Sequence, residues 1–361
     1  MRILMVFRDG ETDNLFVDTL LKGIQEQGTD IQCSIDKFWQ DNSFYDVIHF
    51  QWPEEVIGWN CSDSTIVDKL KARIDILKSK GSRFVYTRHN ERSHYSGSII
   101  DEAYRVIESE SDIIVHLGQY SQDQFLASHP TSQNIIIPHH IYEGTYDENI
   151  SCAEARQRLG ITKKKFVITA FGKFRNNQEI SMVLKAFLQC KLKHKYLLAP
   201  RLLPFSPHPK HTNRLKRYIS WLGYHIAIPA CKLLHINAGC NEELITNSEL
   251  PYYISASDVI FIQRKHILNS GNIPLAFLFK KIVVGPNVGN IRGLLQEVGN
   301  PVFNPEDTNS IVVALQQAQQ LCRIKEGEVN YRYALKYFSL KETCKKYIDV
   351  YRNLLIEQPF L

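Results

Sequence analysis

The chain has 361 residues, which is longer than one typical domain, so two domains are expected. Its 44% hydrophobic and 22% charged residues are the usage of a folded, soluble protein. No apolar run approaches the roughly 20 residues that span a bilayer, and the N-terminal segment lacks the pattern of a signal peptide. The eight cysteines include no Cys-x-x-Cys pair, which indicates a cytoplasmic protein with reduced thiols and no structural zinc.

The positive charge is distributed unevenly along the chain. The formal net charge is +5, but no acidic residue occurs between Glu179 and Glu242. This window contains ten basic residues, namely Lys185, Lys191, Lys193, Lys195, Arg201, Lys210, Arg214, Lys216, Arg217 and Lys232. Such a one-signed stretch suggests an anionic partner: a membrane surface, a phosphorylated lipid or a nucleic acid. The alternative is a solvated basic face without a partner.

The first half of the chain predicts a parallel α/β domain. Apolar, β-branched runs alternate with segments whose apolar residues recur at helical spacing. The predicted strands are 2–7, 30–35, 45–55 with a break at Pro53, 82–90, 111–121 and 134–140, and the predicted helices are 13–27 and 64–81. This alternation predicts a parallel sheet that is covered by helices on both faces.

The same alternation restarts after Lys164 and predicts a second sheet. Its predicted elements are strands 165–175, 194–203, 258–264 and 282–284 and a helix at 180–190. A polar, charged segment at 151–165 separates the two series, and the predicted domains are 1–155 and 156–339. The final helix, 340–358, has a packing face at helical spacing, formed by Tyr347, Ile348, Tyr351, Leu354 and Leu355.

Two polar turns flank the helix and strand of the segment 269–290. The first turn, Ser-Gly-Asn at 270–272, carries turn and cap residues, and Pro274 fits the first turn of a helix. The backbone N–H groups of this turn are therefore expected to be free to bind an anion. The second turn follows the strand at 285–290, on the sheet edge where open α/β folds bind ligands. The alternative is an ordinary helix–strand unit capped by glycine and asparagine.

Four segments of the chain resemble, in this order, the markers of the group 1, or family 4-like, glycosyltransferases. They are "IIIPHHIY" (135–142), "FGKFRNNQEISMVLKAF" (171–187), "ELPYYISASDVIFI" (249–262) and "GNIPLAFLFKKIVVGPNVGNIRGLL" (271–295). The resemblance covers nearly the whole chain and implies the α/β GT-B fold, in which two Rossmann-like domains face a cleft. It also implies that the second domain holds a nucleotide-sugar donor, that the first holds the acceptor, and that the final helix returns to the first domain.

The implied donor site departs from the family in its best-known feature. The family has two glutamates that contact the donor sugar and the ribose, and Asn269 and Phe277 stand in their places. Phenylalanine accepts no hydrogen bond, and asparagine replaces only part of a carboxylate. The turn itself survives, and its N–H groups need no particular side chain to hold a diphosphate. The implied donor-binding residues are Gly172, Gln178, Asn269, Ser270, Gly271, Asn272, Ile273 and Asn290.

Three positions after the first strand of the second domain bear on catalysis. Lys173 stands where the family often has arginine, Arg175 occupies another commonly basic position, and Gln178 falls where lysine is usual. The resemblance implies that Lys173 and Arg175 stabilise the charge that develops on the leaving diphosphate. The alternative is that both are ordinary surface charges.

The implied acceptor site lies in the first domain. "YTRHNERSHY" (86–95) is similar to the family's strand that ends in a histidine-bearing turn, so His89 is expected to contact the transferred sugar or the acceptor. His49 and Trp52 at another strand end, with Asp9 and Gly10 in the loop after the first strand, complete this prediction. The alternative is that the histidines are structural and that Trp52 is a packing residue.

The resemblance also favours a mechanism. Related enzymes retain the anomeric configuration by front-face attack assisted by the leaving phosphate. An inverting enzyme would instead need a general base, for which His89 and Asp9 are the candidates. Because no Asp-x-Asp motif is present, we expect no metal and no other cofactor.

The predicted partners follow from the basic window. Its segment 212–228 has the composition of an interfacial helix, with Leu215, Ile219, Trp221, Leu222 and Tyr224 among Arg214, Lys216 and Arg217. We expect these cations to bring a polysaccharide or cell-envelope enzyme to an anionic membrane and a lipid-linked acceptor. Nucleic acid is disfavoured because the window has no recognised module. The alternative from another class is a non-catalytic GT-B subunit that binds an anionic lipid or a partner enzyme.

Overall fold

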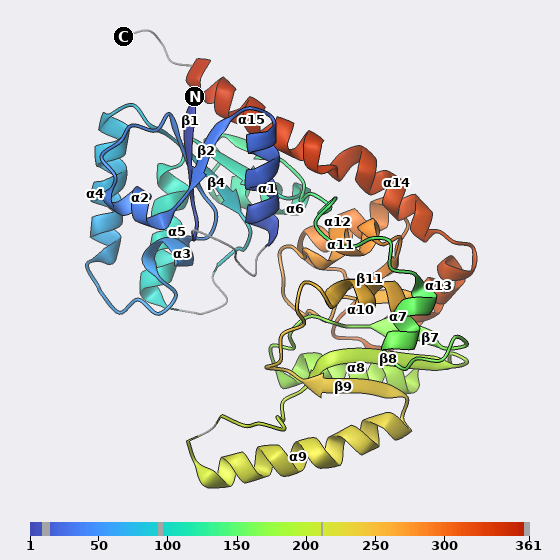
Figure 1. Cartoon of the computed structure of the whole chain (residues 1–361). Coiled ribbons are helices and arrows are strands. Elements are labelled where there is room, and N and C mark those ends of the chain that lie inside the picture. The colour runs from blue at the N-terminus through green and yellow to red at the C-terminus, as the bar shows by residue number, and fades with distance from the viewer. Residues whose placement is uncertain (9–14, 93–96, 211, 357–361) are drawn as a thin grey trace. The chain divides into compact units, whose positions relative to one another are not determined.

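The computed structural model describes residues 1–8, 15–92, 97–210 and 212–356, which form two compact α/β units (Figure 1). Unit 1 comprises Met1–Tyr142 and Tyr337–Leu361, and unit 2 comprises Glu143–Lys336. The first boundary therefore lies after Tyr142. The charged segment at which the sequence placed the domain boundary lies inside unit 2, where it forms helix α7 (Cys152–Arg158).

The sheet of unit 1 is parallel, in the order β2-β1-β3-β4-β5-β6. Its strands are β1 (Arg2–Val6), β2 (Asp30–Cys33), β3 (Val47–Phe50), β4 (Arg83–Arg88), β5 (Ile113–His116) and β6 (Asn134–Ile136). Its helices are α1 (Leu15–Glu26), α2 (Ile35–Gln40), α3 (Pro53–Ile57), α4 (Ile66–Ser79), α5 (Ser98–Glu110) and α6 (Gln119–Ser128). The chain order reverses between β1 and β3, so the carboxyl ends of these strands flank the place where open α/β sheets bind ligands.

The last helix, α15 (Leu340–Ile356), packs on unit 1 rather than extending into solvent. Tyr347, Ile348 and Tyr351 are buried, and Leu355 is half-buried. The hydroxyl of Tyr351 lies 2.8 Å from Nδ1 of His49 in β3. The apolar stripe of this helix thus lies against the N-terminal part of the chain, where the resemblance placed it.

Unit 2 has a second parallel sheet, in the order β12-β11-β10-β7-β8-β9. Its strands are β7 (Phe166–Thr169), β8 (Lys195–Leu203), β9 (Ile236–Cys240), β10 (Val259–Phe261), β11 (Ile282–Pro286) and β12 (Val302–Phe303). Its other helices are α8 (Asn177–Gln189), α9 (Arg214–Leu233), α10 (Leu250–Ala256), α11 (Asn272–Leu278), α12 (Gly289–Glu297), α13 (Thr308–Arg323) and α14 (Gly327–Phe338), the last of which ends in unit 1. The order reverses between β7 and β10, so their carboxyl ends mark the expected ligand site of this unit.

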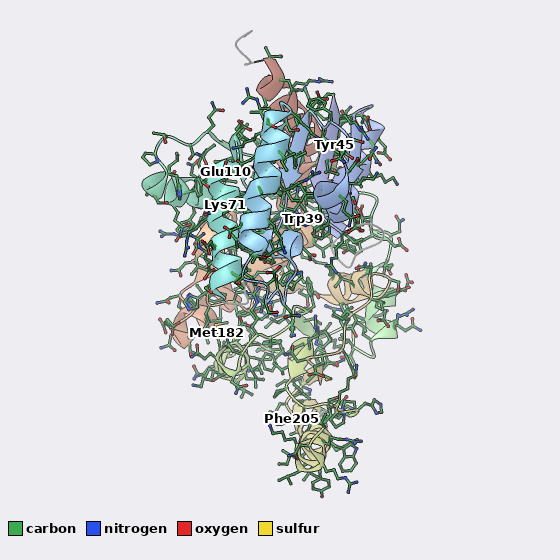
Figure 2. All side chains as sticks on the ribbon, turned by 90° about the vertical axis from the view of Figure 1, so that its left-hand side faces the viewer. Trp39, Tyr45, Lys71, Glu110, Met182 and Phe205 are labelled. Atoms are coloured by element: carbon green, nitrogen blue, oxygen red, sulfur yellow. The ribbon has the colours of Figure 1, made fainter. Side chains whose placement is uncertain are left out.

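Each sheet carries its own apolar core. In unit 1, Tyr45 is buried and Trp39 packs against the same cluster, and in unit 2 Met182 belongs to a separate cluster (Figure 2). The sequence predicted the α/β class and the two parallel sheets correctly, because buried parallel strands are recognisable as apolar, β-branched runs. It did not predict β9 and β12, whose runs are short.

Among the described residues, every helix is too short or too polar to cross a membrane.

Candidate functional site

Four residues meet at the carboxyl ends of β7 and β10 in unit 2. A Cβ on Gly172 would lie 3.0 Å from Nε2 of Gln263 and 3.4 Å from Nδ2 of Asn272. It would lie 3.5 Å from Nη2 of Arg264. Gln263 also donates a hydrogen bond from Nε2 to the carbonyl oxygen of Gly172, at 2.6 Å. Because glycine has no side chain, three groups that carry N–H donors converge beside its backbone.

Arg264 is the fixed cation of this group. Its Nη1 forms an ion pair of 2.8 Å with Oε2 of Glu179, and the two side chains are only 12% and 3% exposed. The same carboxylate oxygen accepts a hydrogen bond from the backbone N–H of Arg175, at 2.8 Å. Burial lowers the pKa of Arg264 to about 10, against the opposing effect of Glu179, so the guanidinium stays charged at neutral pH. Its bidentate shape suits an anionic oxygen pair such as that of a diphosphate.

Helix α8 holds Glu179 in place for this ion pair. The side chain of Asn176 caps the helix by accepting a hydrogen bond from the N–H of Glu179, at 3.0 Å. This is the N-cap arrangement, in which a side-chain oxygen satisfies an N–H that has no partner inside the helix. The carboxylate therefore projects from the first turn of a well-capped helix.

The cations that the sequence predicted are more exposed than Arg264. Lys173 and Arg175 are exposed, as is Gln178. Oε1 of Gln178 accepts a hydrogen bond from Nζ of Lys265 at 3.4 Å, so a lysine lies near the position where the family has one. The sequence pointed to the end of β7, whereas the buried cation beside Gly172 comes from the end of β10. The rule that ligands bind at the carboxyl ends of neighbouring strands could have identified Arg264, which directly follows a buried strand.

The second polar turn stands beside the first. Nδ2 of Asn290 donates a hydrogen bond of 2.7 Å to Oδ1 of Asn269. The backbone N–H of Asn290 donates to the carbonyl oxygen of Leu268 at 2.9 Å. Gly289 has a φ of +53°, and a Cβ there would collide with the carbonyl oxygens of Ile267 and Leu268. Only glycine allows this close approach of the two turns.

The first turn offers fewer backbone donors than the sequence suggested. The N–H of Ile273 donates to the carbonyl oxygen of Ser270 at 3.2 Å, and the Ile273 side chain is buried. Ile273 therefore stabilises the turn and the core and is not an anion donor in this conformation. Among the described residues, no hydrogen-bond partner is found for the N–H groups of Ser270, Gly271 and Asn272. A cradle at this turn would consist of these three N–H groups and the Asn272 side chain.

Phe277 is a core residue. Its side chain is 0% exposed on α11. The position at which the family has a ribose-binding glutamate is thus occupied by an apolar packing residue.

We expect Phe277→Glu to lower the free energy of unfolding by about 3 kcal/mol or more, because it removes a packed ring and buries a carboxylate. Phe277→Leu, which keeps an apolar side chain, should cost about 1 kcal/mol. The control is Leu188→Glu at an exposed position of α8, which should change stability by less than about 0.5 kcal/mol. Urea unfolding measures all three. Equal stability of Phe277→Glu and the wild type would contradict the assignment of Phe277 to the core.

In unit 1, His89 and Trp52 are in contact. Their rings stack at 3.8 Å with an interplanar angle of 10°. Nε2 of His89 lies 2.8 Å from Oε1 of Gln51, an oxygen that can only accept, so Nε2 carries the proton. Burial lowers the pKa of His89 well below its usual value, so the ring is neutral at physiological pH. One face of Trp52 is therefore covered by His89 and is not available for stacking on a sugar in this conformation.

His49 does not lie at an accessible edge of unit 1. Its side chain is 0% exposed, and its Nε2 lies 2.8 Å from Oγ1 of Thr87, while Nδ1 contacts Tyr351 as described above. Burial lowers its pKa to about 3. His49 thus links β3, β4 and α15, which is a structural arrangement. The other predicted acceptor residues, Asp9 and Gly10, lie outside the described residues.

Two further histidines, which the sequence analysis did not select, surround Phe16. The rings of His140 and His139 lie 5.0 Å and 4.6 Å from the Phe16 ring, and His89 approaches its edge at 5.0 Å. Nε2 of His140 is hydrogen-bonded to the carbonyl oxygen of Phe16 at 3.1 Å. Burial lowers the pKa of His139 to about 3 and that of His140 to about 4. The HisHis pair within "IIIPHHIY" was visible in the sequence, but nothing in it indicated contact with a helix at the start of the chain.

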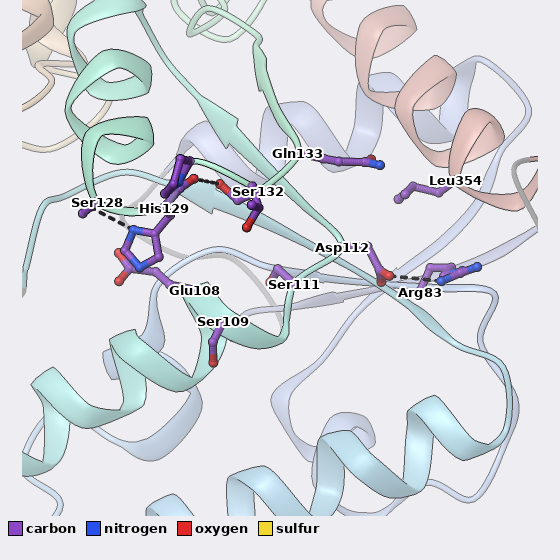
Figure 3. Close-up of a pocket in the computed structure, with 12 residues that line it drawn as sticks. Arg83, Glu108, Ser109, Ser111, Asp112, Ser128, His129, Ser132, Gln133 and Leu354 are labelled. Atoms are coloured by element: carbon purple, nitrogen blue, oxygen red, sulfur yellow. Dashed lines mark hydrogen bonds and ion pairs between the residues drawn. The ribbon is translucent and has the colours of Figure 1, made fainter.

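A cavity of about 640 Å³ in unit 1 lies elsewhere (Figure 3). Arg83 and Asp112, which line it, come from the amino ends of β4 and β5 and form an ion pair of 3.1 Å. Oδ2 of Asp112 also accepts a hydrogen bond from the N–H of Phe84. These contacts join two strands at the sheet edge opposite the carboxyl ends, so this cavity is not part of the candidate site.

Comparisons with known proteins support the fold strongly and the family weakly. No protein-family model matches the chain, and no curated protein sequence does. Among solved structures, sucrose-phosphate synthase from Thermosynechococcus elongatus superposes with a TM-score of 0.69 at 12% identity, over 99% of this chain and 100% of that one. HepE from Anabaena in complex with UDP-glucose gives a TM-score of 0.66 at 14% identity, over 98% and 100% of the two chains. A putative UDP-N-acetylglucosamine 2-epimerase from Listeria monocytogenes gives 0.57 at 12% identity, over 99% and 97%.

These likenesses define the class of protein to which the chain belongs by architecture. It has the GT-B fold, with two Rossmann-like parallel-sheet units, and its group 1-like resemblance is consistent with these neighbours. Because one of these structures is of a putative epimerase, the fold does not by itself decide the reaction.

Proposed function

We propose that the chain is a glycosyltransferase that takes a sugar from a nucleotide-sugar donor bound at the carboxyl edge of the unit 2 sheet. The observation that supports this most is the buried cation of Arg264 beside Gly172 and Asn272. A charged guanidinium, an amide and a glycine that permits close backbone approach are what a diphosphate requires. That HepE is named as a UDP-glucose complex accords with this proposal.

The proposed reaction is transfer with retention of configuration. The bond between the anomeric carbon and the diphosphate oxygen breaks, the acceptor hydroxyl oxygen bonds to the same face of that carbon, and the hydroxyl proton passes to the leaving phosphate. Arg264 and the N–H groups of the 270–272 turn stabilise the charge on that phosphate. Lys173 and Arg175, which are exposed, approach the diphosphate when it is bound. We expect activity without a metal or another cofactor, which turnover in the presence of a chelator tests.

The proposed acceptor binds to unit 1. We propose a glycan or a lipid-linked acceptor in polysaccharide or cell-envelope biosynthesis, which would bind to unit 1 near His89 and Trp52. The enzyme would act in the cytoplasm, peripherally on an anionic membrane through Arg214, Lys216 and Arg217. All three side chains are exposed at the start of α9, which accords with this role.

The second candidate is a non-catalytic GT-B subunit that binds an anionic lipid or a partner enzyme. It is favoured by the replacement of both family glutamates, and by the burial of Phe277 in the core. Such a subunit would keep the fold and lose the donor site.

Thermal unfolding with a panel of nucleotide sugars, followed by assay of nucleotide release, separates these two functions. A ligand at about a hundred times its Kd stabilises the native state by about 2.7 kcal/mol, which raises Tm by several degrees. The matched variant is Gly172→Val, whose side chain would fill the space beside Gln263, Asn272 and Arg264. We expect the wild type to be stabilised by one nucleotide class and the variant not to respond. No stabilisation and no nucleotide release with any donor would favour the non-catalytic subunit.

A further inference from the structure

Helix α9, which connects β8 to β9 in unit 2, is unusually exposed (Figure 1). It has 20 residues, and Ser220 is the one residue that is fully buried. A helix in a water-soluble protein normally buries an apolar stripe. In α9, the large apolar side chains that are exposed are Leu215, Tyr218, Ile219, Trp221, Leu222, Ile226 and Leu233.

One face of α9 is already used for packing. Ser220 accepts a hydrogen bond at its Oγ from the N–H of Ser206, at 3.0 Å. Phe205 packs so closely on Gly223 that a Cβ there would lie 2.8 Å from the ring (Figure 2). The remaining residues of this face, which are half-buried, are Tyr224, Ala227, Ile228 and Cys231. Helical spacing therefore fixes which side of α9 points away from unit 2.

The outward side of α9 is a continuous apolar stripe. Its residues follow one another at helical intervals of four, three, four and seven, and are Leu215, Ile219, Leu222, Ile226 and Leu233. Residues at these intervals share one face of a helix, and 3.6 residues per turn place this face about 120° round the helix from Ser220 and Ala227. Within the part of the chain that the structure describes, no element covers this stripe, since Leu215 is 66% and Leu233 is 83% exposed.

The charge on α9 indicates which kind of surface covers the stripe. The helix carries Arg214, Lys216, Arg217 and Lys232 and no acidic residue, within the acid-free window between Glu179 and Glu242. Packing against a second copy of α9 would bring eight such cations together without a single carboxylate to offset them. An anionic lipid surface offsets them and also offers hydrocarbon for the stripe.

We propose that α9 lies in the plane of an anionic bilayer with Leu215, Ile219, Leu222 and Ile226 immersed at the acyl boundary. The inference rests on the proposed function only in that a lipid-linked acceptor gives the enzyme a reason to be there. Arg214 and Lys216 lie on the two flanks of the stripe, from which they reach lipid phosphates, whereas Arg217 lies on the far side of the helix. Tyr224, which the sequence placed among the interfacial residues, belongs instead to the inward, half-buried face.

Trp221 marks the headgroup level in this arrangement. Its ring lies 4.4 Å from that of His225 and beside Tyr218, about 130° round the helix from the centre of the stripe. A cavity of about 430 Å³ next to it is lined by Pro207, His208, Pro209, Arg217, Tyr218 and Trp221. Tryptophan and tyrosine prefer the polar boundary of a membrane, where an apolar ring body meets water and headgroups.

Co-sedimentation of the full chain with vesicles tests the proposal. One set of vesicles contains phosphatidylcholine alone, and the other contains equal amounts of phosphatidylcholine and phosphatidylglycerol. We expect binding to the anionic vesicles, and a fall in the partition coefficient by about a hundredfold when Arg214, Lys216 and Arg217 are all changed to glutamine. The matched control changes Lys163, Lys164 and Arg323, which are exposed elsewhere in unit 2, to glutamine and should leave most of the binding intact.

The apolar stripe is tested by Leu222→Ser with Ile226→Ser, which should lower the partition coefficient by about tenfold or more. The control is Leu188→Ser, an exposed leucine on α8, which should have no effect. Tryptophan fluorescence should shift to shorter wavelength on anionic vesicles, and Trp221→Phe should abolish the shift. Vesicle binding that is unchanged by both α9 variants would overturn the proposal. So would a dimer in analytical ultracentrifugation that the Leu222 and Ile226 changes dissociate.

Nucleotide release by the same variants, assayed without vesicles, separates this inference from the proposed function. We expect the α9 variants to release nucleotide at the wild-type rate, because the helix lies outside the site at Gly172. The wild type could bind anionic vesicles, and the α9 variants fail to bind them, while no donor is turned over. In that case the glycosyltransferase proposal would be wrong and the proposal of membrane binding by α9 would be supported.

Discussion

Arg264→Ala should lower the turnover of a nucleotide sugar by about a hundredfold, as expected when one preorganised donor to a developing anion is removed from a shielded site. The guanidinium is held by Glu179, so it need not reorganise when the diphosphate leaves. By contrast, Arg175→Ala removes an exposed cation and should lower turnover by about tenfold, since one charge-assisted contact contributes about 1.5 kcal/mol at the low end. Steady-state kcat and KM measure both.

Matched variants separate catalysis from folding at this position. Arg264→Lys keeps the charge without the bidentate shape and should fall between the wild type and Arg264→Ala. Arg264→Ala leaves Glu179 buried without its cation, so Arg264→Ala combined with Glu179→Gln should recover stability without recovering turnover. A larger loss of turnover from Arg175→Ala than from Arg264→Ala would indicate that the catalytic cation is Arg175, as the sequence suggested.

Unit 1 should lose stability steeply as the pH falls below about 6.5. In the folded state, burial lowers the pKa of His49 and His139 to about 3 and that of His116 and His140 to about 4. The unfolded chain binds protons at these rings near pH 6.5, while the folded unit does not. Each ring therefore contributes stability that is present above pH 6.5 and is lost on acidification, by about 1.4 kcal/mol per pH unit. At about pH 5.5 the four rings together lower the free energy of unfolding by about 6 kcal/mol, which is comparable with the stability of a small protein.

Urea unfolding at several pH values, followed by tryptophan fluorescence, measures this dependence. Trp39, Trp52 and Trp59 report on unit 1. His49→Gln should reduce the slope by about one proton, whereas His208→Gln, at an exposed position of unit 2, should leave it unchanged. A free energy of unfolding that is constant between pH 7 and about 5 would mean that these rings are protonated in the folded protein.

Much of the architecture was predictable because it depends on local patterns. Strands such as β1, β4 and β11 are apolar runs, and helices such as α8 and α15 have apolar stripes, so their types follow from side-chain periodicity. The glycine and asparagine turns at the ends of β7 and β11 were also visible as sequence. The domain boundary was not, because the charged segment at 151–165 resembles a linker and yet forms a helix that packs on α10.

What the sequence alone determined is the class of fold, the place of Gly172 and the two turns at strand ends, and the acid-free window that contains α9. Each of these depends on residue type and spacing within a short segment. The tertiary structure decided the rest, because the deciding contacts join residues far apart in the chain. Arg264 reaches Gly172 only because β10 pairs with β7. The outward stripe of α9 is defined only because Ser220 and Gly223 pack inward. His49 likewise becomes a buried, neutral group only where α15 returns to cover β3, since desolvation depends on what lies around a side chain and not on its neighbours in sequence.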